Sequence, residues 1–312
     1  MKIYHNLSEF KPKGNAIVTT GTFDGVHIGH RKILARLIEK AREVNGESVL
    51  LTFWPHPKLV LSPDSHTRVT RILTTIEEKM GLLEELGIDH LVILPFTREF
   101  SELSCEQYIE DVLVSGFGTK AMVIGYDHRF GRNREGGIDY LLQHSERFKI
   151  EIEEISRQEI DNITISSTKI RKALEEGDIH TANELLGRNY DFSGTVVKGR
   201  QLGRQIGFPT ANVKIPNEFK LIPKNGVYAV KAWVRGVKYG GVMNIGVRPT
   251  VEGKGITQEV YIFDFSDDIY GENVKVEIVD FIRDEQKFDG IEALVGQIKA
   301  DVETAKGILG VL

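Results

Sequence analysis

Short apolar runs alternate with longer amphipathic runs over residues 16–156. The short runs are rich in β-branched residues, as buried strands are, whereas the longer runs repeat their apolar residues with helical spacing. This alternation predicts βαβ units and a doubly wound parallel sheet with helices on both faces, a Rossmann-like α/β domain. The predicted strands are Ala16 to Thr20, Ser48 to Phe53, His90 to Leu94, Ala121 to Gly125 and Ile150 to Ile155. The predicted helices cover residues 31–44, 75–86, 104–115 and 137–148.

The pattern changes near Tyr190, where helical spacing gives way to alternating strand runs separated by Gly, Pro and Asn. Such runs predict a small antiparallel β-barrel, followed by one long helix from Ile291 to Lys306. The predicted strands are Phe192 to Val197, Gly226 to Val234, Lys238 to Asn244, Gln258 to Phe265 and Val274 to Phe281. We place the boundary between Leu186 and Tyr190, which gives domains of residues 1–187 and 188–312.

Composition narrows the class of protein. The length of 312 residues suits two domains that each bury a core, and 41% hydrophobic with 27% charged residues is ordinary for a globular chain. A net charge of −5 does not favour a protein that coats nucleic acid. The single cysteine, Cys105, cannot form an internal disulfide and fits a reducing cytoplasm. No signal core or membrane-length apolar run is present, so we expect a cytoplasmic protein without membrane or nucleic-acid partners, of unspecified oligomeric state.

The stretch TGTFDGVHIGH, residues 20–30, directly follows the first predicted strand and precedes the first predicted helix. Gly21 and Gly25 allow a tight turn, and a helix that begins near His27 sets His27 and His30 on one face of its first turn. Free backbone amides and the positive end of the helix dipole point there as well, which predicts a socket for phosphate. The alternative is an ordinary turn in which the histidines only cap the helix.

Three later stretches of the first half carry similar signals. Residues 125–137, GYDHRFGRNREGG, hold three arginines and four glycines, which suits either a phosphate-handling loop or a solvated charged loop. The helix that begins at residues 166–167 has Lys169 and Arg171 near its N-terminus, an unfavourable place for cations unless an anion is bound there. Phe96 and Phe100 flank polar residues after the third predicted strand. The two aromatic rings could pack under a loop or contact a ligand, and the sequence favours neither.

The second half is centred on GRQLGRQIGFPTAN, residues 199–212. Its glycines allow backbone amides to approach a ligand, and its arginines offer charge for phosphate. No GK[ST] follows the glycines, so the segment is not a Walker A loop. Thr210 and Asn212 are neutral oxygen donors of the kind that Mg²⁺ accepts. The alternative is a glycine-rich turn of the barrel.

The stretch GTFDGVHIGH resembles bacterial FAD synthetases of the nucleotidylyltransferase superfamily, and SSTKIR at residues 166–171 resembles their second signature. The resemblance implies that His27 and His30 act on the ATP phosphates. It implies nucleotide contacts from Gly21, Phe23, Asp24, Gly29, Asp127, Ser167, Thr168 and Arg171. It also implies a flavin contact from Phe96. This chain has His128 where the family pattern has its first Phe, and that position stays unassigned.

The second half resembles riboflavin kinases through residues 199–212, NIGVRPT at 244–250, EVYIFDF at 259–265 and IRDEQKF at 282–288. The resemblance implies that Thr210 and Asn212 hold MgATP and that Glu259 is the catalytic base. It implies nucleotide contacts from Gly199, Arg200, Gly203 and Gly207. Arg283 is expected either at the flavin or in a salt bridge with its acidic neighbours.

At least six motifs in the expected order cover nearly the whole chain and resemble the bifunctional riboflavin kinase/FAD synthetase family. The resemblance implies ATP-dependent phosphorylation of riboflavin to FMN by the barrel, then adenylyl transfer from ATP to FMN by the α/β domain, giving FAD and pyrophosphate. The small-molecule partners would be riboflavin, FMN and ATP, with Mg²⁺ or another divalent cation. Two alternatives are an adenylyltransferase for another phosphate and a non-catalytic flavin carrier or regulator.

Overall fold

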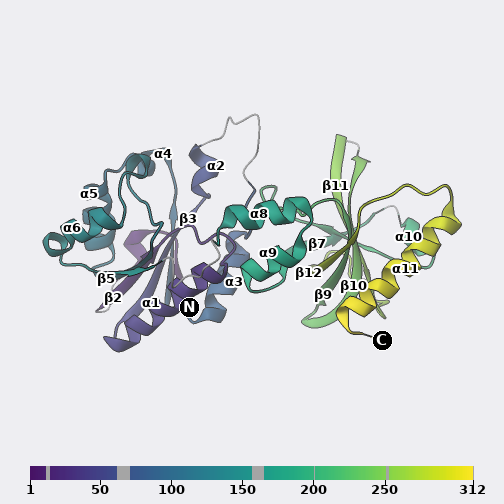
Figure 1. The fold of residues 1–312 in the computed structure, drawn as a ribbon, viewed down its shortest axis with the longest axis horizontal. Coiled ribbons are helices and arrows are strands. Elements are labelled where there is room, and N and C mark those ends of the chain that lie inside the picture. Colours follow the sequence, from purple (N-terminus) through teal and green to yellow (C-terminus); the bar gives the residue numbers. More distant parts are fainter. Residues whose placement is uncertain (12–14, 62–70, 157–164, 200, 251–252, 312) are drawn as a thin grey trace. The chain divides into compact units, whose positions relative to one another are not determined.

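The computed structural model describes residues 1–312 except 12–14, 62–70, 157–164, 200, 251–252 and 312 (Figure 1). The chain divides into two compact units, an N-terminal unit, Met1–Ser167, and a C-terminal unit, Thr168–Leu312. The predicted boundary at residues 187 and 188 concerns the functional domains and stays a prediction.

The described part of the N-terminal unit is built on a six-stranded sheet in the order β1-β4-β3-β2-β5-β6, with every neighbouring pair parallel. The strands are β1 (Lys2–Tyr4), β2 (Ala16–Thr20), β3 (Glu47–Trp54), β4 (His90–Pro95), β5 (Thr119–Gly125) and β6 (Glu151–Ile155). The predicted parallel sheet is therefore confirmed. β1 was not predicted, because a three-residue strand is too short to show a periodic pattern.

Four predicted helices correspond to α1 (Ile28–Glu43), α3 (Ile76–Leu86), the pair α5 (Cys105–Gln107) and η2 (Tyr108–Gly116), and α6 (Ile138–Phe148). The helix predicted over residues 104–115 is present, and its first α-helical turn continues as the π-helical segment η2. Short unpredicted elements are η1 (Leu7–Glu9), α2 (Pro57–Leu61), α4 (Arg98–Ser101) and η3 (Arg132–Arg134).

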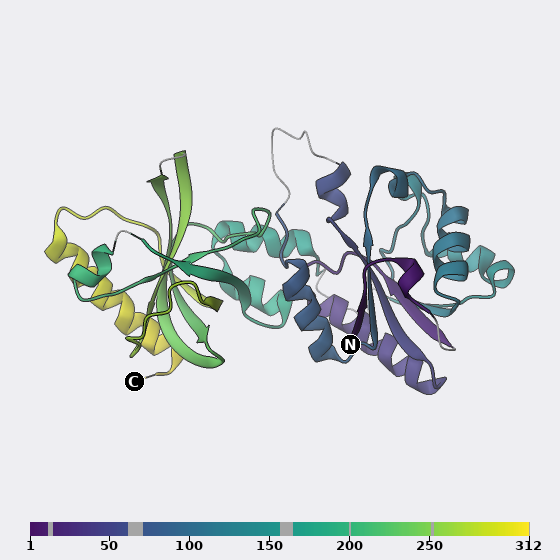
Figure 2. The ribbon, with the colours of Figure 1, turned by 180° about the vertical axis from the view of Figure 1, so that it is seen from behind.

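Successive residues of the central strands pack on opposite faces of the sheet. Leu50 packs with α1 and α3 on one face, whereas Val49 and Leu51 pack with η2 and α6 on the other (Figures 1 and 2). β2, β4 and β5 alternate in the same way. The strands read as continuous apolar runs because both faces of the sheet are buried.

The strand order places the histidine turn at a distinctive point. The chain proceeds from β2 to β3 and β4 on one side of the sheet, then returns to β5 and β6 on the other. The order therefore reverses between β2 and β5, and ligands of such sheets bind at the carboxyl ends of the strands beside this switch point. The turn that carries His27 leaves the carboxyl end of β2.

The described strands of the C-terminal unit form a closed barrel in the order β10-β11-β8-β7-β12-β9, with antiparallel pairs. The strands are β7 (Tyr190–Val197), β8 (Ala211–Lys214), β9 (Gly226–Val234), β10 (Val237–Thr250), β11 (Gly253–Ile262) and β12 (Asn273–Arg283). The predicted barrel and terminal helix are confirmed. β8 was not predicted. β11 begins earlier than predicted, and it ends earlier because the chain turns after Ile262 rather than after Phe265.

Four helices accompany the barrel: α8 (Ser167–Glu176), α9 (Ile179–Leu186), α10 (Leu202–Gln205) and α11 (Ile291–Leu309). On α9, the apolar side chains of Ile179, Ala182 and Leu186 are buried. The Asn183 side chain donates to the Ile278 carbonyl at 3.0 Å and accepts from the Tyr190 amide at 2.7 Å. α9 is therefore fastened to two strands of the barrel.

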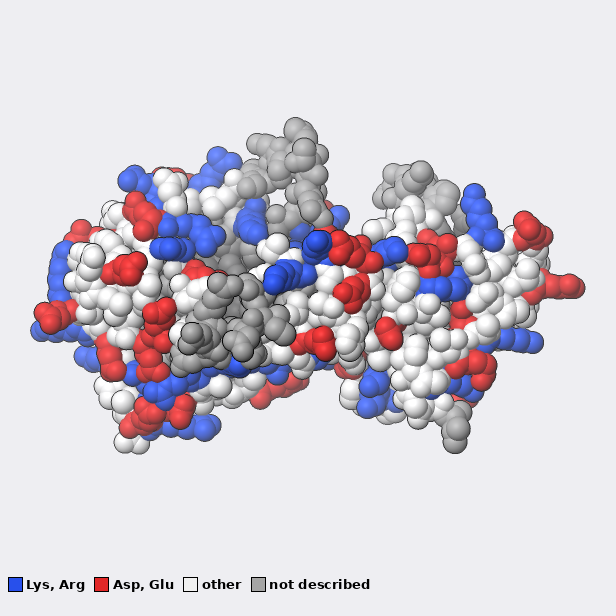
Figure 3. Space-filling model, viewed as in Figure 1, with Lys and Arg blue, Asp and Glu red and all other residues white. Residues whose placement is uncertain are grey.

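The surface and hydropathy of the described residues add two observations. No helix among them is both long and apolar enough to cross a membrane. On the face that Figure 3 shows, their acidic and basic side chains are interspersed rather than gathered by sign.

Two candidate active sites

The turn after β2 holds a strained backbone. Phe23 has φ 44° and Val26 has φ 41°, while Gly25 has φ 88°. Glycine adopts this conformation freely, but a bulky or β-branched residue there is an outlier that costs about 1–3 kcal/mol. Such strain persists only where surrounding contacts hold it, and it is typical of ligand-binding turns.

Several buried groups hold the turn. The Asp24 carboxylate, 2% exposed, accepts from the Leu73 amide at 2.9 Å and the Thr74 amide at 3.1 Å. The Gly25 amide donates to Thr74 Oγ1 at 3.1 Å, and Ser167 Oγ donates to the Asp24 carbonyl at 2.9 Å. Asp24 thus turns its carboxylate into the fold, where it fixes the turn.

His27 and His30 lie together at the start of α1, as predicted. His27 is the N-cap residue, and its Nδ1 accepts from the His30 amide at 3.3 Å. The two rings are stacked with centroids 3.5 Å apart and planes 15° from parallel. Burial, followed by the positive fields of His27 and Lys79, lowers the pKa of His30 well below its usual value. Among the described residues, His30 Nδ1 is buried and has no hydrogen-bond partner, so a polar contact for this nitrogen is missing.

The remaining predicted residues of this site are distributed around the turn. Gly21 donates its amide to the Leu51 carbonyl at 3.0 Å, and the Phe23 ring packs 5.0 Å from the His30 ring. Gly29 is buried in the first turn of α1. Ser167 is brought to the turn by its bond to Asp24. Thr168 and Arg171 lie in α8, and their contact with the ATP phosphates stays a prediction.

Phe96, the predicted flavin residue, is partly buried in a group of aromatic rings beyond β3 and β4. Its ring centroid lies 5.7 Å from that of Phe53 and 5.8 Å from that of Phe100. Phe100 in turn contacts Tyr108, whose hydroxyl lies 2.9 Å from Thr20 Oγ1 at the end of β2. A cluster of aromatic rings therefore extends from the carboxyl end of β2, in which Tyr108 is buried and Phe96 and Phe100 are partly exposed.

The segment after β5 contains the predicted Asp127, which is exposed, and His128 beside it. The His128 ring lies 5.7 Å from the Phe130 ring and nearly parallel to it. Burial, then Arg134 and Arg129, lowers the pKa of His128 to about 4. Its Nε2 has no hydrogen-bond partner in the described part of the chain.

A pH-dependent stability follows for the N-terminal unit. Between pH 6.5 and about 4, His128 is protonated in the unfolded chain but neutral in the folded protein. The free energy of unfolding therefore falls as the pH falls through this window. We expect His128→Phe to remove up to about 2 kcal/mol of the stability difference between pH 7 and pH 5. Urea unfolding followed by Trp54 fluorescence in a Trp233→Phe background measures it. Equal pH dependence with and without His128 would contradict the assignment.

The glycine-rich segment of the C-terminal unit encloses a second site. A Cβ at Gly199 would lie 2.4 Å from Asn212 Nδ2, and one at Gly203 would lie 2.3 Å from the Phe208 carbonyl oxygen. Gly207 has φ 86°. Glycine is required at 199 and 203 because neighbouring atoms leave no room for a Cβ. It is favoured at 207 because the backbone there has a positive φ. The predicted Arg200 lies outside the described residues.

A cavity of about 300 Å³ opens beside this segment. It is lined by predicted residues and by acidic side chains that the sequence did not single out. The lining includes Gly199, Arg204, Thr210, Asn212, Asp267 and Asp268. The hydroxyl, amide and carboxylate oxygens of this set are the ligand types that Mg²⁺ prefers, so Thr210 and Asn212 fit a metal–nucleotide complex.

Glu259 lies beside the cavity residues through the barrel register. It is paired with Asn212 on β8 and with Asn244 on β10, so the three side chains share one face of the sheet. Glu259 Oε2 lies 3.5 Å from Thr210 Oγ1, longer than an ideal hydrogen bond. The structure therefore brings the predicted base next to the predicted metal-holding pair.

Arg283 is engaged with a residue that the sequence reasoning missed. Its Nε and Nη2 donate to the two oxygens of Asp301 at 2.8 and 2.7 Å, and Nη1 donates to the Asp284 carbonyl at 3.0 Å. Asp301 is 3% exposed and also accepts from Gln297 at 2.9 Å. The predicted alternative of a salt bridge is realised, but with α11 rather than with the side chains of Asp284 or Glu285. A flavin contact by Arg283 stays a prediction.

The two sites define a nucleotide-dependent transferase with two separate centres. Residues 9–169 match a family model described as FAD synthetase, and residues 186–309 match one described as riboflavin kinase. Proteins described as bifunctional riboflavin kinase/FMN adenylyltransferase match almost end to end. The protein of Listeria monocytogenes is 38% identical over 96% of this chain and 94% of its own length. That of Escherichia coli K12 is 38% identical over 98% of this chain and 96% of its own length. That of Bacillus subtilis is 37% identical over 97% of this chain and 94% of its own length. The chain therefore belongs to the bifunctional riboflavin kinase/FMN adenylyltransferase family.

A solved structure shares the whole architecture. A crystal structure described as a macrolide-efflux protein from Streptococcus pneumoniae is 32% identical and superposes with a TM-score of 0.88 over 98% of each chain. That likeness supports the same two-part fold in both proteins.

Proposed function

We propose that this protein makes FMN from riboflavin and ATP, and then FAD from FMN and a second ATP. The observation that carries the proposal is the presence of two candidate sites in one chain. One has stacked histidines at a sheet switch point, and the other has Glu259 beside a cavity lined with oxygen ligands.

Adenylyl transfer would proceed at the His27 and His30 turn. A phosphate oxygen of FMN attacks the α-phosphorus of ATP, the new P–O bond forms, and pyrophosphate leaves. The attacking phosphate is already ionised, so positioning and charge neutralisation carry most of the rate and no strong base is required. His27 and His30 would hold the phosphates from one side, with Ser167, Thr168 and Arg171 from the other.

Riboflavin phosphorylation would proceed at Glu259. The primary hydroxyl of the ribityl chain attacks the γ-phosphorus of ATP, Glu259 accepts its proton, and ADP leaves. Thr210 and Asn212 would hold the metal–nucleotide complex, and the glycine backbone beside them would approach its phosphates. A divalent cation supplies charge neutralisation between the phosphate oxygens when it is bound.

Chromatography of products over time tests both reactions. Purified protein is incubated with riboflavin, excess ATP and Mg²⁺, beside a parallel reaction begun from FMN. We expect FMN followed by FAD in the first tube and FAD in the second. FMN alone would confine the chemistry to the barrel and reopen the substrate of the N-terminal unit. A bound flavin that never turns over would favour the carrier alternative, and preference for a different phosphate over FMN would favour the other adenylyltransferases.

A further inference from the structure

Lys79 on α3 is a buried cation that the reactions above do not use. Its side chain is 3% exposed. Nζ donates to the Thr22 carbonyl at 2.6 Å and lies 3.4 Å from Thr52 Oγ1. Burying an ammonium group is costly unless neighbouring groups compensate, so a lysine at this position needs a reason beyond helix formation.

The bond to Thr22 acts at the start of the strained turn. Thr22 immediately precedes Phe23, and the strained segment ends at Val26, one residue before the first histidine. Thr74 and Leu73 hold the far side of the same turn through Gly25 and Asp24. Lys79 therefore supplies the shorter of two bonds to the Thr22 carbonyl on the β2 side, since Thr52 Oγ1 donates to the same carbonyl at 3.3 Å.

The charge of Lys79 acts on the same place. Its positive charge contributes to the lowered pKa of His30, and Asp24 is the charged group that interacts with Lys79. Burial lowers the pKa of Lys79 to about 8, while Asp24 opposes that shift. At neutral pH the ammonium is still mostly protonated, so a positive charge lies at the Thr22 carbonyl and acts on His30.

We propose that Lys79 is a positioning residue for adenylyl transfer, which holds the Thr22–Val26 turn through the Thr22 carbonyl and places there a positive charge that acts on His30. The inference rests on the proposed function of the N-terminal unit. Because Lys79 itself is buried, it acts through the turn and the histidines rather than by touching the nucleotide. Its loss should therefore lower turnover more than it weakens substrate binding.

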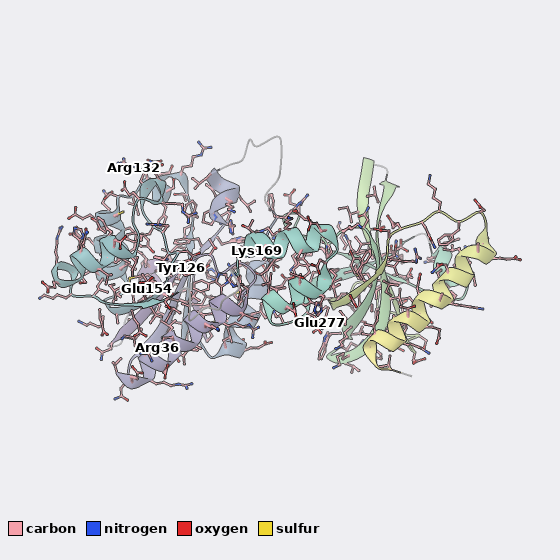
Figure 4. All side chains as sticks on the ribbon, in the orientation of Figure 1. Arg36, Tyr126, Arg132, Glu154, Lys169 and Glu277 are labelled. Carbon is pink, nitrogen blue, oxygen red and sulfur yellow. The ribbon has the colours of Figure 1, made fainter. Side chains whose placement is uncertain are left out.

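Lys40 offers a matched control. It is 6% exposed on α1, and its Nζ pairs with Glu151 at 2.7 Å and Glu153 at 2.8 Å. Arg36, which Figure 4 labels, pairs with the same Glu153. Lys40→Met removes a buried lysine from the same unit without touching the strained turn. The variant therefore shows how much activity is lost when a buried lysine is removed from the N-terminal unit away from the histidine turn.

The experiment compares Lys79→Met, Lys79→Gln and Lys40→Met with the parent protein in steady-state FAD formation from FMN. We expect Lys79→Met to lower kcat by about 30-fold or more with KM for FMN changed less than about threefold, and Lys40→Met to stay within about twofold. The parent rate should also fall as the pH rises through about 8, and Lys79→Met should lack this basic limb. Trp54 fluorescence during urea unfolding, in a Trp233→Phe background, reports whether the N-terminal unit is folded.

Each outcome decides the proposal. A folded Lys79→Met protein with parental kcat and the same basic limb overturns it. If Lys79→Met does not fold, Lys79→Gln carries the same test, and loss of the fold in both variants makes Lys79 structural and overturns the positioning role. Parent protein that forms no FAD at all refutes the proposed function instead, and so the two failures are distinguishable.

Discussion

His30→Ala is expected to form FAD from FMN at least about 100-fold more slowly than the parent protein, while phosphorylating riboflavin at the parental rate. The His30 ring is stacked on His27, and its Nδ1 has no partner among the described residues. Loss of a preorganised donor to developing charge typically costs about 10²–10³ in rate, and alanine removes that donor outright. FAD formation from FMN and FMN formation from riboflavin, measured in separate tubes, give the two rates.

The riboflavin kinase rate of the same sample is the internal control for this variant, because the kinase site lies in the other unit. His180→Ala is the matched control, since His180 is a histidine with an 80% exposed side chain on α9. Equal loss of both activities would indicate a folding defect or a wrong assignment of the site.

Glu259→Gln should lower the rate of FMN formation from riboflavin by about 100-fold or more. It should leave the rate of FAD formation from added FMN unchanged. A general base typically contributes about 10²–10⁴ to a rate, and glutamine keeps the shape of the side chain without a proton acceptor of comparable strength. The register with Asn212 and Asn244 should preserve the barrel in this variant. Product chromatography from riboflavin and from FMN measures the two steps separately.

Glu303→Gln provides the comparison for the kinase experiment, because Glu303 is exposed on α11. Riboflavin turnover that survives Glu259→Gln would rule out the role of Glu259 as base. It would leave the cavity beside Thr210 as a nucleotide site whose proton acceptor lies elsewhere.

Much of the fold could be predicted because its strands are buried on both faces. The run Val49 to Leu51 is apolar throughout since alternate residues face different helices, and such runs are easy to find. β8 was missed because two of its four residues, Ala211–Lys214, belong to the motif of residues 199–212, which looked like a loop. The helix over residues 104–115 was predicted, but its continuation as the π-helical segment η2 was not, because apolar spacing does not distinguish a π-helix from an α-helix.

The candidate sites were predicted to different depths. Motif residues such as His27, His30, Thr210 and Glu259 were found, because their types and spacing carry the chemistry. Lys79 was missed because it follows two glutamates in an amphipathic helix, a pattern that predicts a lysine exposed to solvent. Its burial depends on a carbonyl 57 positions earlier in the chain, which no local pattern reveals. The direction of the Asp24 carboxylate is likewise a property of tertiary structure.

α9 has a consequence for any attempt to dissect this enzyme into fragments. A gene truncated after codon 187 would express a fragment that retains the whole second signature, Ser166 to Arg171, but ends in a helix whose apolar face normally packs on the barrel. The complementary fragment would begin with an uncovered patch on β7 and β12. Co-expression of the two pieces should therefore yield a reassembled pair more readily than either piece yields a soluble product by itself. α9 therefore belongs with the barrel, and a cut after residue 187 separates this helix from the strands that it covers.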